Sequence, residues 1–255
     1  MSVENFINRI AEDAHALGIR EGDMIVMHSS FKSLGPVEGG IGTVIAGLRR
    51  ALTEEGTFFV PALSFATVHK DQPVFDLKNT PACIGAIPEY FRQMEGVTRS
   101  MSPTHSVCGI GGRARELLSR QMEDDTPVGP HSAFRAVRDW GGKILFLGCS
   151  PASNTSMHGV EELVRPYYLF GESYLYDCID EKGIHHPLTC ARHNFHGNHL
   201  AQRYLRALDI LAPGDFRWGK ILQADCCLME AQPLWEKAEK KLQQDETFFV
   251  EPMED

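Results

Sequence analysis

Apolar side chains near the N-terminus recur at helical spacing, at Val3, Phe6, Ile7, Ile10, Ala14 and Leu17. Ser2 can cap the start of this segment and Gly18 can end it, so we predict a helix between them. Two short apolar runs follow, at residues 24–28 and 57–62, and each has the length of a buried strand. A Gly-rich loop and a helical pattern over 41–52 separate them, which is the order of a crossover α/β unit.

The same patterns predict further elements along the chain: helices near 84–94, 112–120, 132–140, 200–211 and 232–242, and strands over 143–148 and 219–230. Residues 173–180 and 184–190 alternate around a Glu-Lys-Gly turn, which favours a β-hairpin. The irregular stretch 64–81 is expected to cover a face of the sheet. We therefore expect an α/β fold, a single domain over residues 1–255 with a central mixed sheet flanked by helices and an antiparallel C-terminal addition.

Composition and charge limit the partners. The 255 residues are 43% hydrophobic and 23% charged, with a formal net charge of −9, which argues against a nucleic-acid partner. No apolar run approaches the ~20 residues of a membrane span, and the N-terminus lacks the pattern of a signal peptide. The seven cysteines form no C-x-x-C motif and suggest no disulfide framework. We therefore expect a cytoplasmic protein without a membrane partner.

The loop after the first predicted strand suits an anionic ligand. It reads H-S-S-F-K-S-L-G-P-V-E-G-G over residues 28–40 and leads into a helix. Serine hydroxyls and backbone N–H groups at such a turn can hold a phosphate. The spacing matches neither a dinucleotide fingerprint nor a Walker loop, so a flexible Gly-rich connection is an equal alternative.

A second polar loop, S-P-T-H-S-V-C-G-I-G-G over 102–112, lies before a predicted helix and can present hydroxyls and amides to a ligand. Cys108 and His105 raise the alternative of a thiol nucleophile with its base. The alternating pattern around Cys108 is more typical of a buried, unreactive thiol.

The segment N-T-S-M-H-G-V-E-E, residues 154–162, places a histidine and two carboxylates within one turn of a predicted helix start. His158 and Glu161 are three residues apart and share one helix face. The carboxylate can accept the Nδ1–H of the imidazole and leave Nε2 as a general base. The alternative is a capping cluster, with His158 in solvent.

Histidines concentrate in R-H-N-F-H-G-N-H, residues 192–199, after His185 and His186. This density suggests a metal site, but H-x-x-H-x-x-H is not a common zinc spacing. Polar contacts of this segment to a sugar or an amine are an alternative. We expect no metal requirement, and a metal-dependent hydrolase built on these late histidines is the alternative from another enzyme class.

Together these segments resemble the antibiotic N-acetyltransferase family, typified by the aminoglycoside 3-N-acetyltransferases. The matching segments occur in one order: G-D-M-I-V-M-H-S-S-F-K-S-L-G, G-T-F-F-V-P-A, S-P-T-H-S-V-C-G-I-G, D-T-P-V-G-P-H-S-A-F, G-G-K-I-L-F-L-G and N-T-S-M-H-G-V-E-E. They cover roughly residues 1 to 165, and several motifs in one order are more specific than any one alone.

The resemblance implies an enzyme of antibiotic resistance that transfers an acetyl group directly from acetyl-CoA, its cosubstrate, to an amine of an aminoglycoside. His158 would be the general base and Glu161 its carboxylate partner. The coenzyme would be held by His28, Ser29, Ser30, Phe31, Leu34, Gly35, Thr104, His105, Ser106 and Val107. We expect the oxyanion donor near Ser106 and Val107, and the acceptor at Glu161, Glu162, Arg192 and His193.

The acceptor itself stays open at this stage. The chain after the predicted catalytic helix is shorter than in resistance enzymes, and residues 192–199 do not resemble their acceptor region. Proteins that resemble this fold also acetylate amino sugars carried on nucleotides, so the same chemistry on an amino sugar or another small amine is an alternative. A segment rich in Arg192 and histidines suits an anionic acceptor, whereas the overall charge suits a cation. The sequence does not determine the oligomeric state.

Overall fold

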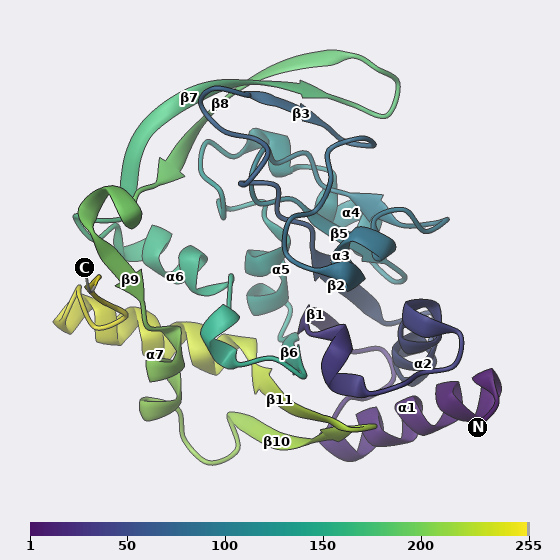
Figure 1. The fold of residues 1–255 in the computed structure, drawn as a ribbon. Helices are drawn as coiled ribbons and strands as arrows, with labels where there is room; N and C mark the ends of the chain where they lie inside the picture. Colours follow the sequence, from purple (N-terminus) through teal and green to yellow (C-terminus); the bar gives the residue numbers. More distant parts are fainter. Residues whose placement is uncertain (254–255) are drawn as a thin grey trace.

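A seven-stranded mixed sheet lies at the centre of the computed structural model, which describes residues 1–253 (Figure 1). The strand order is β10-β11-β6-β1-β2-β5-β4. Its middle is parallel, with β1 (Met24–Ser29) between β2 (Thr57–Pro61) and β6 (Lys143–Leu147). The antiparallel strands on either side are β4 (Thr98–Arg99), β5 (Val107–Ile110), β10 (Phe216–Ile221) and β11 (Ala224–Glu230).

Helices cover both faces of the sheet, which explains why the central strands are continuous apolar runs. One face packs against α1 (Val3–Leu17), α2 (Gly40–Leu52) and α3 (Ala86–Phe91). The other packs against α4 (Ala114–Leu118), α5 (Ala133–Asp139), α6 (Met157–Val164) and α7 (Ala231–Gln244). Side chains of β1 alternate between these two cores: Ile25 and Met27 join the first, and Val26 joins the second.

The hairpin of β7 (Phe170–Ile179) and β8 (His185–His193) arches away from the central sheet (Figure 1). The short strand β3 (Val74–Asp76) pairs with β7 in parallel. A separate pair is formed by β9 (Leu200–Gln202) and β12 (Val250–Pro252). Short 3₁₀ helices complete the chain: η1 (Phe31–Leu34), η2 (Gln121–Glu123), η3 (Pro151–Ser153), η4 (His196–Asn198) and η5 (Tyr204–Asp209).

The predicted fold class is confirmed, with a mixed sheet, flanking helices and a late antiparallel addition. Among the described residues, no helix is both long and apolar enough to cross a membrane. The single strand predicted over 219–230 is wrong, because the chain reverses between β10 and β11. Leu222 takes a left-handed φ of 53° at this turn, and its N–H is donated to Asp13 of α1.

The helix predicted over 200–211 is also wrong, because this segment forms β9 and then η5. The C-terminal segment supplies partners that an isolated helix would not have. Arg206 donates to the carbonyl oxygens of Phe248 and Val250 and pairs with Glu251, with Nη2–Oε2 at 2.5 Å. These tertiary contacts outweigh the helical periodicity of the segment.

Helix α6 packs against α7 at a glycine. A Cβ atom at Gly159 would lie 2.1 Å from Cη2 of Trp235 and 2.8 Å from Cγ1 of Val128. Trp235 is almost completely buried, with 1% of its surface exposed. The two helices therefore approach closely only because position 159 has no side chain.

We predict that Gly159→Ala lowers the free energy of unfolding by roughly 1–3 kcal/mol, because overpacking forces a core side chain or the helix itself to move. Chemical denaturation followed by circular dichroism measures this loss. Leu163→Ala, at a 38% exposed position of the same helix, is the control and should cost less. An unchanged or raised stability of Gly159→Ala would contradict the close packing of α6 on α7.

Candidate active site

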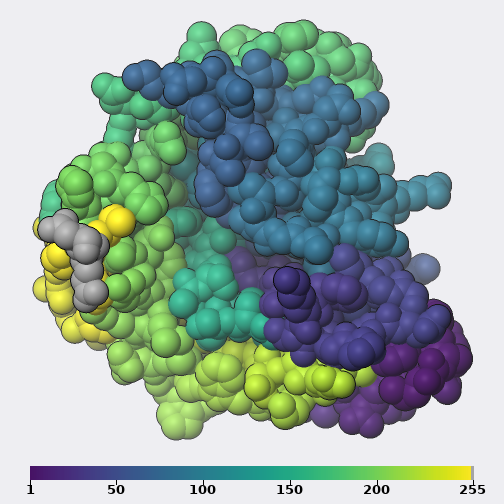
Figure 2. All heavy atoms as spheres, in the orientation of Figure 1, coloured from purple at the N-terminus to yellow at the C-terminus, as the bar shows by residue number. Residues whose placement is uncertain are grey.

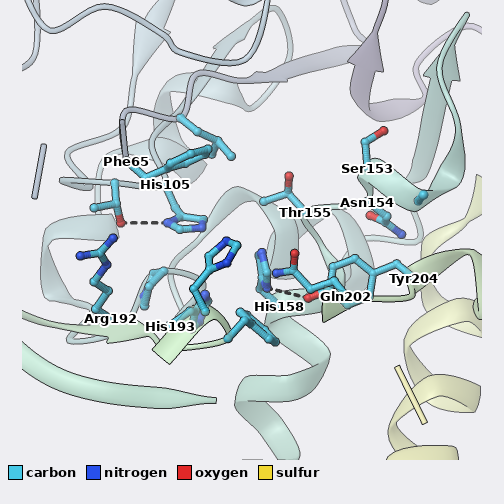
Figure 3. A pocket seen from close by; sticks show the side chains of 16 residues that line it. Phe65, His105, Ser153, Asn154, Thr155, His158, Arg192, His193, Gln202 and Tyr204 are labelled. Carbon is cyan, nitrogen blue, oxygen red and sulfur yellow. Dashed lines mark hydrogen bonds between the residues drawn. The ribbon is translucent and has the colours of Figure 1, made fainter. Parts of the chain in front are cut away.

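A cavity of about 280 Å³ lies beyond the carboxyl ends of the parallel strands, which is where open α/β sheets bind ligands. Figure 2 shows the surface hollowed between the blue and the green segments of the chain. The cavity is lined by Leu63, Phe65, Thr104, His105, Pro127, Ala152, Ser153, Asn154, Thr155, His158, Arg192, His193, Phe195, His196, Gln202 and Tyr204. Half of these residues lie on loops, and the others come from short 3₁₀ helices, α6, β8 and β9 (Figure 3).

His158 lies in the first turn of α6 and lines the cavity, whereas Glu161 lies behind it with no exposed surface. The distance from His158 Nδ1 to Glu161 Oε2 is 3.3 Å. Tyr204 contacts both groups, with its hydroxyl 2.9 Å from His158 Nδ1 and 2.7 Å from Glu161 Oε2. Tyr168 donates to the other carboxylate oxygen at 3.1 Å. The structure thus brings together the pair expected from the helical spacing and adds two tyrosines.

The hydrogen atoms available to this group determine the tautomer of His158. Tyr204 has one hydroxyl hydrogen, and it is donated to Glu161, which as a carboxylate only accepts. The hydrogen between Tyr204 and His158 must therefore belong to Nδ1 of the imidazole. In the neutral imidazole, Nε2 then has no hydrogen and is free for a substrate in the cavity.

Glu162 points to a different set of partners, because adjacent helical positions lie on different faces. Its carboxylate accepts from Thr126 Oγ1 at 2.6 Å, from the Val128 N–H at 2.8 Å, and lies 2.9 Å from His193 Nε2. Arg135 is 4.0 Å away. Burial raises the pKa of Glu162 above its usual range. Neither Glu161 nor Glu162 lines the cavity, so both act on it through the side chains that they hold.

The imidazoles of His105, His158 and His193 lie next to one another in the cavity (Figure 3). The ring centroids of His105 and His158 are 5.6 Å apart, those of His105 and His193 are 5.4 Å apart, and those of His158 and His193 are 4.6 Å apart. Thr104 Oγ1 holds His105 Nδ1 at 2.8 Å. Burial lowers the pKa of both His105 and His193 well below the ordinary value. These two rings are therefore neutral at neutral pH.

A second cavity of about 210 Å³ lies next to the first and shares Leu63, Ser153 and Thr155 with it. His28 and Ser29, which end β1, line this cavity. The Nε2 atom of His28 and the hydroxyl of Ser29 are buried and have no hydrogen-bond partner among the described residues. Buried polar atoms of this kind are candidates for ligand contacts.

The other coenzyme candidates lie outside the two cavities, apart from Thr104 and His105. Leu34 is buried in the core, and Gly35 takes a left-handed φ of 75° beside Gln223. Ser30 and Phe31 lie at the start of η1 and line neither cavity.

Ser106 and Val107 are buried within the sheet region rather than open to a ligand. The Ser106 hydroxyl donates to the carbonyl of Ala62, and the Val107 N–H donates to Ser100. Both donors proposed for the oxyanion are therefore used inside the protein. Cys108 has no exposed surface, and burial raises its pKa to about 12, so it is an unreactive core thiol.

The late histidines do not form one cluster. His193 joins the three-imidazole group, and Arg192 and His196 also line the cavity. His199 adopts a left-handed φ of 51° after η4. The earlier pair of histidines binds carboxylates of the hairpin: His185 contacts Asp177 at 2.8 Å, and His186 contacts Asp180 at 3.0 Å.

Sequence reasoning missed Tyr168 and Tyr204, the two hydroxyl donors to Glu161. Tyr204 lies 43 residues from Glu161, within a segment predicted to be an α-helix. It also missed Thr126 and the contact between Glu162 and His193. No local spacing in the sequence connects Thr126, His193 or Tyr204 with α6, since these contacts join residues 31 to 43 positions apart.

Comparison with known proteins identifies the family. The family model described as aminoglycoside 3-N-acetyltransferase matches residues 26–243. The chain belongs to this family. Among curated relatives, aminoglycoside N(3)-acetyltransferase VII of Streptomyces paromomycinus is 31% identical over 172 residues, which are 61% of this chain and 59% of the relative. Aminoglycoside N(3)-acetyltransferase III of Serratia marcescens is 30% identical over 62% of this chain and 65% of its own length. These matches span less than two thirds of both relatives.

Solved structures of similar proteins have the same fold. Aminoglycoside acetyltransferase AAC(3)-Xa superimposes with a TM-score of 0.82 at 24% identity, over 93% of this chain and 92% of its own. The YokD protein of Bacillus subtilis gives 0.80 at 25% identity, over 94% of each chain. AAC-IIIb, solved with CoASH, gives 0.79 at 22% identity, over 92% of this chain and 95% of its own.

The burial of His28 predicts a loss of stability in acid. Burial lowers its pKa from 6.5 to about 4, so the unfolded chain takes up a proton first as the pH falls. The buried, neutral His28 imidazole therefore costs no stability above pH 6.5. Between pH 6.5 and 4 the free energy of unfolding falls, because only the unfolded chain binds this proton. We predict that the wild type loses about 3 kcal/mol more than His28→Gln over this interval.

Urea unfolding at several pH values measures this difference. His185→Gln is the control, because this imidazole is exposed, with 62% of its side chain accessible. The control should follow the wild type. If the free energies of unfolding of wild type and His28→Gln differed by the same amount across the interval, the result would contradict a buried, neutral His28.

Proposed function

We propose that this protein transfers the acetyl group of acetyl-CoA to an amine of an aminoglycoside, directly and in a ternary complex. Family membership and the names of the curated relatives support this reaction class. The observation that carries the proposal is the arrangement around His158, whose Nδ1 contacts Tyr204 and Glu161 while the ring lines the cavity. Nε2 is therefore the group positioned to take a proton from an acceptor.

The chemistry requires such a base, because an acceptor amine arrives as an ammonium ion. Nε2 of His158 takes one proton, and the freed amine nitrogen attacks the thioester carbonyl carbon. A carbon–nitrogen bond forms, the carbon–sulfur bond breaks, and the departing thiolate takes up the second proton that the nitrogen loses as it becomes an amide. His158 then releases its proton to solvent. Tyr204 and Glu161 stabilise the imidazolium that forms, since the Nδ1–H is donated toward both. No metal ion and no cysteine nucleophile takes part.

The coenzyme's pantetheine arm would occupy the cavity lined by His28 and Ser29. Its amide groups would satisfy the unpartnered His28 Nε2 and Ser29 hydroxyl. Because this cavity shares residues with the one that contains His158, the thioester could reach the base. The phosphates would then lie outward, along the polar loop that contains Ser30. Solved members of the fold include one with CoASH and one bound to sisomicin.

We infer that the family domain extends over residues 1–255. The family model reaches 26–243, and the described residues outside it pack on that part. Helix α1 supplies Ile10 and Leu17 to the core shared with α2, and Val250 of β12 packs with Leu200 of β9.

We predict that His158→Ala lowers kcat/KM by about 10²–10⁴-fold, the contribution of a positioned base. Acetyl-CoA binding should be retained. Free-thiol release with a panel of aminoglycosides measures the rate, and calorimetry measures coenzyme binding. The control is His186→Ala, on the hairpin and bonded to Asp180, which should keep the wild-type rate. Thiol release that His158→Ala retained would contradict the assignment of the base.

A specific observation supports a second candidate, an amino sugar that carries an anionic group, including one linked to a nucleotide. Among the described residues that line the cavity there are Arg192 and four histidines, but no aspartate or glutamate. A polycationic aminoglycoside would find no carboxylate on this surface, whereas a phosphate would find a guanidinium. Glu161 and Glu162 are buried and hydrogen-bonded elsewhere.

Substitution of Arg192 distinguishes the two acceptor classes. If the acceptor is anionic, Arg192→Gln raises its KM by about 10–100-fold through the loss of a charge-assisted hydrogen bond. Steady-state kinetics with a nucleotide-linked amino sugar and with an aminoglycoside make the comparison, and Arg115→Gln, at an exposed position, is the control. An aminoglycoside KM that stays constant or falls in Arg192→Gln, with no turnover of the anionic acceptor, would refute the second candidate.

A further inference from the structure

We propose that His105, His158 and His193 form a binding site for one divalent transition-metal ion such as Zn²⁺, and that the bound ion inhibits acetyl transfer. Inhibition follows because the ion occupies Nε2 of His158, the atom that must accept a proton. The inhibition rests on the proposed function, whereas the metal site itself does not.

The spacing of the three rings suits a shared metal ion. One ring nitrogen from each histidine lies within 4.8 Å of the other two, and the ring centroids are 5.6, 5.4 and 4.6 Å apart. Three imidazoles on a tetrahedral zinc, with Zn–N bonds of about 2.0–2.1 Å, have their ring centres about 5 Å apart and their ligand nitrogens about 3.4 Å apart. The ring centroids are already close to this separation, and the ligand nitrogens, which lie within 4.8 Å of one another, need to close by up to about 1.4 Å.

Each imidazole also has a neighbour on its other nitrogen. His105 Nδ1 contacts Thr104, His158 Nδ1 contacts Tyr204, and His193 Nε2 contacts Glu162. Metal-binding histidines almost always use their second nitrogen in this way, because the contact fixes the ring and raises its basicity. One nitrogen of each ring is thereby left for a metal, and the carboxylates of Glu161 and Glu162 lie behind the rings to offset its charge.

The strongest independent observation is the free nitrogen of His193. Its side chain is only 6% exposed, and Nδ1 is buried without a hydrogen-bond partner among the described residues. A buried polar atom in this state is costly unless something binds it. A metal ion held jointly with His105 and His158 would provide that partner.

The ligand set differs from the late histidine run that the sequence suggests. His196 and His199 do not belong to the three-histidine group. The three ligands come instead from the loop before β5, the first turn of α6 and the end of β8. With three protein ligands, a fourth coordination position stays open toward the cavity, whereas structural zinc sites are closed by four protein ligands.

Titration of metal-free protein with Co²⁺ tests the site without depending on activity. The wild type should bind one Co²⁺ per chain with the visible absorption of a nitrogen-ligated tetrahedral or five-coordinate ion, and Zn²⁺ should displace it. His105→Ala and His193→Gln should each weaken binding by at least about 100-fold, since even the loss of an outer partner costs 10–100-fold. The matched control is the double variant His196→Ala, His199→Asn, which should bind as the wild type does.

The absence of the cobalt absorption in the wild type would overturn the proposal. It would also be overturned if correctly folded His105→Ala and His193→Gln bound Co²⁺ as tightly as the wild type, or if only the control variant lost binding. Circular dichroism establishes which variants fold, and if neither ligand variant does, the wild-type titration decides. Zn²⁺ should also reduce thiol release by the wild type, with recovery on adding a chelator, and His193→Gln should be less sensitive. A rate increased by Zn²⁺ would overturn the inhibition. If no acceptor supports thiol release, the proposed function fails, and the cobalt titration still decides the metal site.

Discussion

The candidate site depends on one buried carboxylate, that of Glu161. It has no exposed surface, and a carboxylate in the interior is tolerated only when its oxygens are well hydrogen-bonded. Its partners are Tyr168, Tyr204 and His158, which come from the segment after α6, from η5 and from α6 itself. Because these side chains all contact the Glu161 carboxylate, the orientation of His158 depends on how the C-terminal third of the chain folds.

The central sheet explains where this carboxylate lies. The parallel strands β1, β2 and β6 end at the same edge of the sheet, and α6 begins shortly after β6. Gly159 lets α6 lie directly on Trp235 of α7, which sets how closely the two helices pack. Glu162, the next residue after Glu161, holds His193 from the end of β8. The adjacent carboxylates of Glu161 and Glu162 thus connect α6 to two different parts of the chain, η5 and the end of β8.

The sequence predicts the parts of this arrangement that depend on local spacing. Periodicity indicates most of the helices and central strands, and the i, i+3 relation of His158 and Glu161 places them on one helix face. The contacts of Tyr204 and His193 were not predictable in this way, because they join residues 31 to 46 positions apart. The helix expected over 200–211 hid Tyr204, since that segment follows its partners in the C-terminal segment rather than its own periodicity. The gathering of His105, His158 and His193 is likewise a property of the fold.

The central claim is that Glu161 and Tyr204 hold His158 as the tautomer with the hydrogen on Nδ1 and a free Nε2. Nitrogen-15 NMR of histidine-labelled protein at neutral pH tests it directly, with His158→Gln used to assign the signals. The account predicts a pyrrole-type Nδ1 bearing a hydrogen and a pyridine-type Nε2 for His158 in the metal-free protein. A hydrogen on Nε2 would contradict it, because that nitrogen could then neither accept a proton from an amine nor bind a metal ion.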